Sequence, residues 1–259
     1  MIIKGPYPDV SIPETAFTPF VLHRARELAD KPALIDGPTG RKLSYQQLAD
    51  SISIVAYNLA QRGFKKGDVF GILSPNCLEY AIAFHAVATL GGIVTPINPL
   101  YTRHEIVHQL KDSGARFLVT PPSCAEKASE AIADAGVEEL FVFGTAPGAT
   151  SFDSLLVDNG RAEQVAVNPF ADLVALPYSS GTTGLPKGVM LTHRNLVANL
   201  RQIEGLCYFY ETDTLICVLP LFHIYGLVVV LNMGLYSAAT VVLMPRFELE
   251  GFLQAVQDY

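Results

Sequence analysis

The feature that most constrains the fold of this chain is a regular alternation of short apolar runs with longer helical patterns. Residues 68–74 (DVFGILS), 92–98 (GIVTPIN) and 139–143 (ELFVF) are apolar along most of their length, which is typical of strands buried on both faces. Helical patterns separate them, such as the alanine-rich residues 125–135. This alternation predicts an α/β fold in which parallel sheets are flanked by helices.

Local signals mark where several elements begin. Residues 31–44 (KPALIDGPTGRKLS) place a Gly-Pro-Thr-Gly turn between two short β-type runs and predict a hairpin. Ser44 followed by Gln47 is a capping-box pair that predicts a helix. Residues 144–151 (GTAPGATS) have the composition of a linker-like loop, and residues 172–180 and 187–192 each predict one strand. Further helix starts are predicted near Arg103 and after a cap at Thr192.

The charge and hydrophobicity of the chain bear on two possible partners, nucleic acid and the membrane. Half of the residues are hydrophobic and the net charge is −7, so we expect a large core and no basic face for nucleic acid. Between Asp213 and Arg246 the sequence carries no formal charge, a stretch longer than the ~20 residues of a membrane-spanning helix. Pro220 and Asn232 interrupt it, which favours a buried helix with flanking strands over an integral span; loose membrane association stays open.

The N-terminal residues and the cysteines indicate the cellular compartment of the protein. The N-terminal residues lack the apolar segment of a secretory signal. Four cysteines fall at irregular spacings without a CxxC pair, which fits neither a zinc site nor a disulfide framework. We therefore expect reduced core thiols in a cytoplasmic protein. The chain ends inside an amphipathic pattern at Tyr259, and we expect that it is truncated.

Residues 178–193 (YSSGTTGLPKGVMLTH) carry the strongest candidate for chemistry. The glycines permit turns that aim N–H groups into a concavity, the hydroxyls add donors and the lysine adds a positive charge, which together suit a polyphosphate. The stretch has neither the dinucleotide GxGxxG pattern nor the Walker glycine before its lysine. A polar surface turn is the alternative. The candidate phosphate-binding residues are Ser179, Ser180, Gly181, Thr182, Thr183, Gly184 and Lys187.

The longer stretch YSSGTTGLPKGVMLTHRNL resembles the signature of adenylate-forming enzymes, the superfamily of acyl- and aryl-CoA ligases, beetle luciferases and peptide-synthetase adenylation domains. The segments LSYQQL, INPLYTRHEI and MPRFE share the resemblance. LPLFHIYG, at residues 219–226, is most similar to 4-coumarate-CoA ligase and its bacterial relatives. The resemblance covers about residues 17–259.

This resemblance implies a fold and a reaction. It implies that residues 17–259 form a partial N-terminal adenylation domain of the acyl-CoA synthetase/luciferase-like fold, with the C-terminal lid domain absent. A carboxylate would attack Mg-ATP to give an acyl-adenylate, and coenzyme A would then take the acyl group, with ATP, Mg²⁺ and CoA as the implied small molecules. We expect a 4-coumarate-like aromatic acid and an incomplete site that is inactive alone. The alternatives are a medium- or long-chain fatty acyl-CoA ligase and a non-catalytic nucleotide-binding or interaction module.

The resemblance also assigns a second group of residues. His223 matches a histidine between the nucleotide and the acyl group, and Tyr225, Gly226 and Val229 match the acid pocket. Val229 stands where plant 4-coumarate ligases carry a small polar residue, which weakens the case for a phenolic acid. Arg246 stands where related ligases use a lysine near CoA. The alternatives are a core histidine for His223, core packing for Tyr225 and a solvated loop charge for Arg246.

The segment HEIVH, residues 104–108, matches the metalloprotease pattern of two histidines one helical turn apart. Thr102 and Glu105 form a capping box there, and the apolar spacing is that of an ordinary helix. No third ligand is evident in the sequence, so we predict no metal site.

Overall fold

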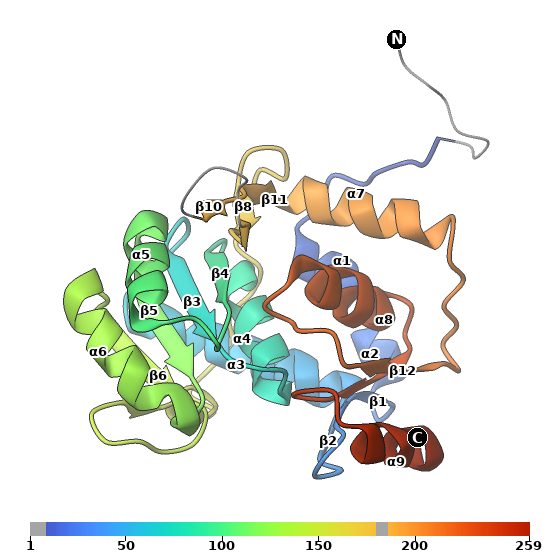
Figure 1. The fold of residues 1–259 in the computed structure, drawn as a ribbon. Coiled ribbons are helices and arrows are strands. Elements are labelled where there is room, and N and C mark those ends of the chain that lie inside the picture. Colours follow the sequence, from blue (N-terminus) through green and yellow to red (C-terminus); the bar gives the residue numbers. More distant parts are fainter. Residues whose placement is uncertain (1–8, 180–185) are drawn as a thin grey trace.

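The computed structural model describes residues 9–179 and 186–259, and the strands within these ranges form three sheets (Figure 1). The large sheet has the strand order β11-β8-β4-β3-β5-β6-β7, the small sheet has the order β12-β13-β1-β2, and β9 pairs with β10 in a separate ribbon. The large sheet comprises β3 (Val69–Leu73), β4 (Ile93–Ile97), β5 (Ala115–Thr120), β6 (Glu139–Val142), β7 (Thr150–Ser151), β8 (Leu173–Ala175) and β11 (Leu191–Thr192). The small sheet comprises β1 (Pro32–Asp36), β2 (Lys42–Ser44), β12 (Thr214–Cys217) and β13 (Thr240–Leu243), and the ribbon comprises β9 (Tyr178–Ser179) and β10 (Lys187–Gly188).

Parallel pairing dominates both main sheets. In the large sheet every neighbouring pair from β8 to β7 is parallel, and β11 is antiparallel to β8. In the small sheet β12, β13 and β1 are parallel, and β2 closes the predicted hairpin with β1. The α/β fold with parallel sheets, predicted from the alternating pattern, is therefore confirmed.

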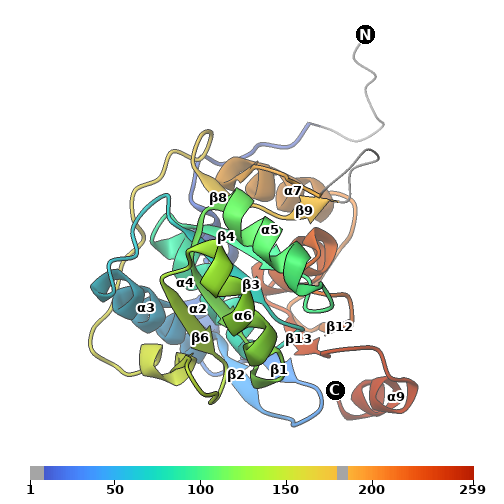
Figure 2. The same cartoon turned by 60° about the vertical axis from the view of Figure 1, so that its left-hand side comes forward.

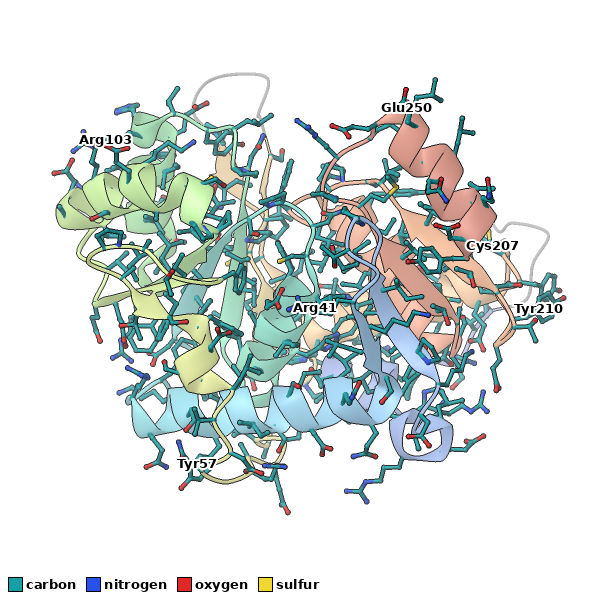
Figure 3. The ribbon with its side chains drawn as sticks, turned by 90° about the horizontal axis from the view of Figure 1, so that it is seen from below. Arg41, Tyr57, Arg103, Cys207, Tyr210 and Glu250 are labelled. Atoms are coloured by element: carbon teal, nitrogen blue, oxygen red, sulfur yellow. The ribbon has the colours of Figure 1, made fainter. Side chains whose placement is uncertain are left out.

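Helices cover and separate the sheets. Figure 2 shows α5 and α6 in front of the large sheet. Helix α4 packs between the sheets and contacts strands of both, and α3 packs against α4 and the small sheet. In Figure 3 α3 runs along the lower side of the molecule. Helix α9 covers the outer face of the small sheet. The α-helices are α1 (Phe17–Val21), α2 (Ala25–Leu28), α3 (Tyr45–Gln61), α4 (Leu78–Thr89), α5 (Arg103–Ser113), α6 (Ala125–Ala135), α7 (His193–Glu204), α8 (Met233–Tyr236) and α9 (Leu249–Asp258). Short 3₁₀ turns are η1 (Pro122–Cys124) and η2 (Phe152–Leu155), and η3 (Tyr225–Asn232) is a π-helix.

Three helices begin with a capping box, each at a position where the sequence predicted the start of a helix. Ser44 and Gln47 form one at α3, and Thr102 and Glu105 form one at α5. The third, at α7, pairs Thr192 with Asn195. Each box satisfies N–H groups that the first helical turn leaves without partners, which explains why a short pattern fixes the start of a helix.

The core is built around α4, because this helix is buried along nearly its whole length. Its apolar side chains meet those of α3 and of strands from both sheets, for example Phe70 and Leu34. A second cluster lies under α5 and α6, where Leu110 packs with Leu118. The two clusters hold the large sheet between helical layers, so its strand ends form a rigid base for loops.

Two local predictions were wrong, and a third was correct except at its end. The strand predicted over residues 172–180 divides into β8 and β9, because Pro177 cannot donate a ladder hydrogen bond. The strand predicted over residues 187–192 also divides, and Met190, which is 70% exposed, lies between β10 and β11. The predicted linker-like loop of residues 144–151 is a loop over residues 144–149, and its last two residues form β7, which extends the large sheet.

The four cysteines differ in burial, and the uncharged stretch forms regular elements. All four cysteines are free, but Cys207 is exposed and only Cys217 among the four is buried, so the prediction of core thiols is wrong for Cys207. Figure 3 shows Cys207 at the edge of the molecule. In the described residues, no helix combines the length and the apolar character needed to span a membrane. The uncharged stretch after Asp213 forms β12, η3, α8 and β13, the predicted buried helix with flanking strands.

Candidate functional site

The glycine- and hydroxyl-rich segment begins and ends in the ribbon. Ser179 on β9 is the cross-strand partner of Lys187 on β10, and both side chains are exposed. Strands therefore precede and follow the segment, as predicted. The candidates between them, Ser180, Gly181, Thr182, Thr183 and Gly184, lie outside the described residues.

A pocket of about 300 Å³ lies beside this ribbon, and we call it the loop-side pocket. It brings Ser179 together with His223, two candidates that are 44 positions apart in the numbering of the chain. Asn98 follows β4 directly, so the pocket lies at the carboxyl end of a parallel strand, where ligands bind in open α/β sheets. Its lining residues are Pro96, Asn98, Tyr101, Gln109, Tyr178, Ser179, Phe222 and His223.

A second pocket, of about 330 Å³, lies between α7 and η3, and we call it the helix-side pocket. His223 lines this pocket too, together with the predicted substrate residues Tyr225 and Val229. Most of the lining is apolar, with Asn195 and Asn199 as polar side chains from α7. The full lining is Leu191, Asn195, Leu196, Asn199, His223, Ile224, Tyr225, Val228 and Val229.

His223 is thus a wall common to the two pockets. Its side chain is exposed, and its Nδ1 accepts a hydrogen bond from the backbone N–H of Tyr225 at 3.2 Å. Tyr225 is 52% exposed. Neither side chain belongs to the core, so the core alternatives for both residues are wrong.

Two local contacts involve residues of the π-helix η3. A Cβ on Gly226 would lie 2.3 Å from the carbonyl oxygen of Pro220, so a side chain here would collide with the backbone. The buried Asn232 donates from Nδ2 to the carbonyl oxygen of Leu227, five residues earlier, at 2.8 Å. π-Helical turns are rare and occur often at functional sites. Gly226 is buried behind the pocket and does not line it.

The loop that carries His223 is held from below by Asn76, at the start of α4. Asn76 is buried, and its Oδ1 accepts from the backbone N–H of Leu221 at 2.7 Å. Its Nδ2 lies 3.0 Å from the carbonyl oxygens of Leu219 and Met244. One amide side chain therefore connects the ends of β12 and β13 to the segment before His223.

Arg246 lies apart from the other candidates. It lines a pocket of about 390 Å³ between the small sheet and α9, which shares no residue with the two pockets described above. Its side chain is 79% exposed and forms an ion pair with Glu248. Glu248 and Asp258 also line that pocket. The guanidinium of Arg246 therefore has carboxylates as neighbours in this pocket.

The sequence predictions missed several pocket residues. Asn98, Tyr101, Gln109 and Tyr178 line the loop-side pocket, and Asn195 and Asn199 line the helix-side pocket. Asn98 could have been found, because it follows a predicted buried strand and such strand ends carry ligand sites. The side chains from α5 and α7 carry no local signal, since only packing decides which helical face meets a pocket.

The histidine pair of residues 104–108 forms no metal cluster. Across residues 9–179 and 186–259 no three His, Cys, Asp or Glu side chains gather as a metal site. His108 instead places Nε2 3.3 Å from the carbonyl oxygen of Pro186. Beside it, burial and a hydrogen bond to Asp112 raise the pKa of the Tyr178 phenol well above its usual value, so this hydroxyl stays a donor.

Comparisons with known proteins agree on one family. The family model described as AMP-binding enzyme matches residues 21–259. 4-Coumarate–CoA ligase 3 of Oryza sativa subsp. japonica is 39% identical over 264 residues, which cover 100% of this chain and 48% of the relative. The chain thus spans about half the length of the curated relatives it matches.

Solved structures resemble the fold over nearly its whole length. A long-chain-fatty-acid–CoA ligase from Archaeoglobus fulgidus superposes with a TM-score of 0.91 at 28% identity, covering 99% of this chain and 52% of that one. ATP-bound MatB from Rhodopseudomonas palustris superposes with a TM-score of 0.76 at 28% identity, covering 92% of this chain and 47% of that one.

Proposed function

Because this chain belongs to the family of AMP-binding enzymes, we propose that it is part of an ATP-dependent carboxylate–CoA ligase acting on an aromatic, 4-coumarate-like acid. The observation that carries the proposal is the position of His223, which lines the loop-side pocket with Ser179 and the helix-side pocket with Tyr225. A nucleotide at the first pocket and an acid at the second would meet at this side chain.

The proposed reaction has two steps. A carboxylate oxygen of the acid attacks the α-phosphorus of ATP, and the bond to the bridging oxygen breaks, which gives acyl-adenylate and pyrophosphate. The thiolate of CoA then attacks the acyl carbon, and AMP leaves. Both steps are served mainly by positioning and by stabilisation of the charge on the phosphates.

We assign the phosphates to the glycine- and hydroxyl-rich segment. Lys187 would supply the ammonium charge and Ser179 a hydroxyl at its two ends, which face each other in the ribbon. Ser180, Gly181, Thr182, Thr183 and Gly184 complete the proposed set on sequence grounds. MatB from Rhodopseudomonas palustris shares the fold at 28% identity and holds ATP in its crystal structure, which supports ATP as the nucleotide.

We assign the acid to the helix-side pocket. The Tyr225 ring would stack on an aromatic acid, Val229 would form an apolar wall, and Gly226 allows η3 to approach residues 219–220. His223 would donate from Nε2 toward the reacting carboxylate, because Nδ1 already accepts from Tyr225. The 4-coumarate–CoA ligases at 36–39% identity support an aromatic substrate.

A fatty acid is the second candidate substrate. The helix-side pocket is largely apolar, and the structure with a TM-score of 0.91 is named a long-chain-fatty-acid–CoA ligase. Thermal unfolding of the protein with ATP and either 4-coumarate or a C8–C16 fatty acid separates the two, because a bound ligand raises the midpoint. Protection by 4-coumarate that is lost in Tyr225→Ala supports the aromatic acid; protection by the fatty acid alone contradicts it.

The described residues offer a candidate contact for CoA but no site for Mg²⁺ in these two pockets. No carboxylate lines the loop-side or helix-side pocket in the described part of the chain, so these residues do not form a magnesium site. For CoA we propose Arg246 as a phosphate contact, which requires its ion pair with Glu248 to open.

Calorimetric titration with ATP tests the proposal. Lys187→Ala should weaken ATP binding at least tenfold, because the lysine supplies a charge-assisted contact to the phosphates. Lys65→Ala, which removes an exposed lysine from the turn between α3 and β3, is the matched control and should leave the affinity unchanged. Absence of lysine-dependent ATP binding would favour a non-catalytic interaction module instead.

A further inference from the structure

Helix α5 contacts the chain on both sides of the proposed phosphate segment. The Tyr178 hydroxyl, one residue before Ser179, donates to Oδ2 of Asp112. On the other side, Nε2 of His108 lies 3.3 Å from the carbonyl oxygen of Pro186, one residue before Lys187. His108 and Asp112 are four residues apart, so both point from the same face of the helix. Figure 2 shows α5 beside β9, and α5 also contacts β10.

The ribbon needs such support, because it consists of two residue pairs. Lys187 pairs with Ser179 and Gly188 pairs with Tyr178. A two-stranded pair is marginally stable by itself, even at greater length. A Cβ on Gly188 would lie 3.2 Å from Cζ of Tyr178, so the glycine allows the phenol ring to lie against the facing strand and to reach α5.

The support is rigid because α5 is itself fixed to the large sheet. Gln109, which is buried, donates from Nε2 to Oγ1 of Thr95 at 2.8 Å and to the carbonyl oxygen of Pro96 at 3.0 Å. Thr95 Oγ1 in turn donates to the carbonyl oxygen of Leu176, two residues before Tyr178. The helix, the end of β4 and the start of the ribbon are therefore joined through side-chain hydrogen bonds.

Among the contacts between α5 and the ribbon, the hydrogen bond of Tyr178 to Asp112 is the strongest. The Tyr178 hydroxyl donates to a carboxylate oxygen of Asp112, and hydrogen bonds to carboxylates are stronger than those between neutral groups. The ring of His108 lies edge-on to the phenol ring, with centroids 6.4 Å apart. Tyr178 also lines the loop-side pocket with Ser179 and His223, so its position sets one wall of that pocket.

We propose that Asp112, Tyr178 and His108 are positioning residues. They hold Ser179 and Lys187 in place for a nucleoside triphosphate. The inference rests on the proposed function, because it takes this segment as the phosphate site. Holding both ends before the ligand arrives lowers the ordering cost of binding, so losing a contact should weaken ATP binding. The proposal also gives His108, the second histidine of the segment HEIVH, a role that needs no metal.

The first arm of the test needs no nucleotide. Amide hydrogen exchange is measured over peptides covering residues 176–190 in the wild type, Tyr178→Phe, Asp112→Asn and His108→Phe. We expect faster exchange in all three variants, at unchanged exchange over α3 and α4. Tyr208→Phe removes an exposed phenol hydroxyl from the loop after α7 and is the matched control. Unchanged exchange in the three variants overturns the proposal.

The second arm measures ATP affinity by calorimetry. Tyr178→Phe and Asp112→Asn should each weaken ATP binding about tenfold, the effect of one charge-assisted hydrogen bond. Their double variant should be no weaker than either single one, and His108→Gln, which keeps a donor nitrogen, should bind ATP more tightly than His108→Phe. In a Lys187→Ala background, Tyr178→Phe should weaken ATP binding less than it does in the wild type, because only the positioning of Ser179 is then lost, whereas general structural damage would add in full to the loss.

The arms separate the two hypotheses. Faster exchange together with unchanged, lysine-dependent ATP affinity overturns the positioning role while the proposed function stands. Wild-type protein that shows no lysine-dependent ATP binding overturns the proposed function, and the exchange arm still reports on the contacts themselves.

Discussion

The Nδ1 atom of His223 accepts a hydrogen bond from the backbone N–H of Tyr225 at 3.2 Å. This contact assigns the ring proton of the neutral imidazole to Nε2, which leaves a donor at the wall common to the loop-side and helix-side pockets. The same contact lies at the start of η3, so the orientation of the ring and the start of the π-helix are coupled.

In a full-length ligase that contains this chain, His223→Ala should slow carboxylate-dependent exchange of pyrophosphate into ATP about 100-fold, the usual size of one lost transition-state donor. The thermal midpoint should stay within about 2 °C, because the side chain is exposed and supports no core contact. Tyr225→Phe, which keeps the backbone N–H, is the control for the hydrogen bond. Equal exchange rates in wild type and His223→Ala would remove this residue from the chemistry.

Gly226→Ala should lower the free energy of unfolding by about 3 kcal/mol, because the new methyl group would overlap the Pro220 carbonyl oxygen and η3 would have to shift. Gly251→Ala in α9 is the matched control. Its nearest atom would be Cε of Met244 at 3.6 Å, an ordinary contact, so it should stabilise the protein by about 0.5–1 kcal/mol through helix propensity. Urea denaturation measures both, and equal effects would contradict the packing argument.

Asn76→Asp should destabilise the protein by about 3 kcal/mol, because a carboxylate cannot donate to the carbonyl oxygens of Leu219 and Met244 and would be buried beside them. Asn199→Ala removes an exposed amide from α7 and should change stability by less than about 0.5 kcal/mol. Chemical denaturation at pH 7.5 compares them. A tolerated Asn76→Asp would show that this side chain does not hold the His223 loop.

Stability should fall as the pH drops from about 6.5 to about 4. Burial lowers the pKa of His85 and of His193 to about 4. The unfolded chain binds protons at these residues below pH 6.5 while the folded chain stays neutral there, so stability is complete above that pH and is lost through the window. Each histidine contributes a loss of up to about 3 kcal/mol.

Urea titrations at pH 7.5 and pH 5.0 measure this loss. His193→Gln should reduce the difference between the two pH values, because it removes one of the two buried histidines that take up protons on unfolding. His104→Gln, at an exposed histidine of α5, should leave the difference unchanged. A pH difference that is the same in wild type and His193→Gln would contradict the assignment.

The fold class and the family could be predicted from the amino-acid sequence alone. Strand burial and helix caps act through neighbours in the chain, so periodic patterns and the pairs Ser44–Gln47 and Thr102–Glu105 located α3 and α5 correctly. The segment of residues 178–193 identified the family because its glycines, hydroxyls and lysine are contiguous. Short-range chemistry of this kind needs no knowledge of distant residues.

Which candidates share a site depends on how the elements pack. Ser179 and His223 meet because β4, the ribbon and the loop after β12 end at one edge of the packed sheets, whereas Arg246 lies in a separate pocket. The same packing brings α5 against the ribbon and leaves Tyr225 exposed. Such contacts join residues far apart in the chain, and only the burial of whole helical and sheet faces in a common core selects them.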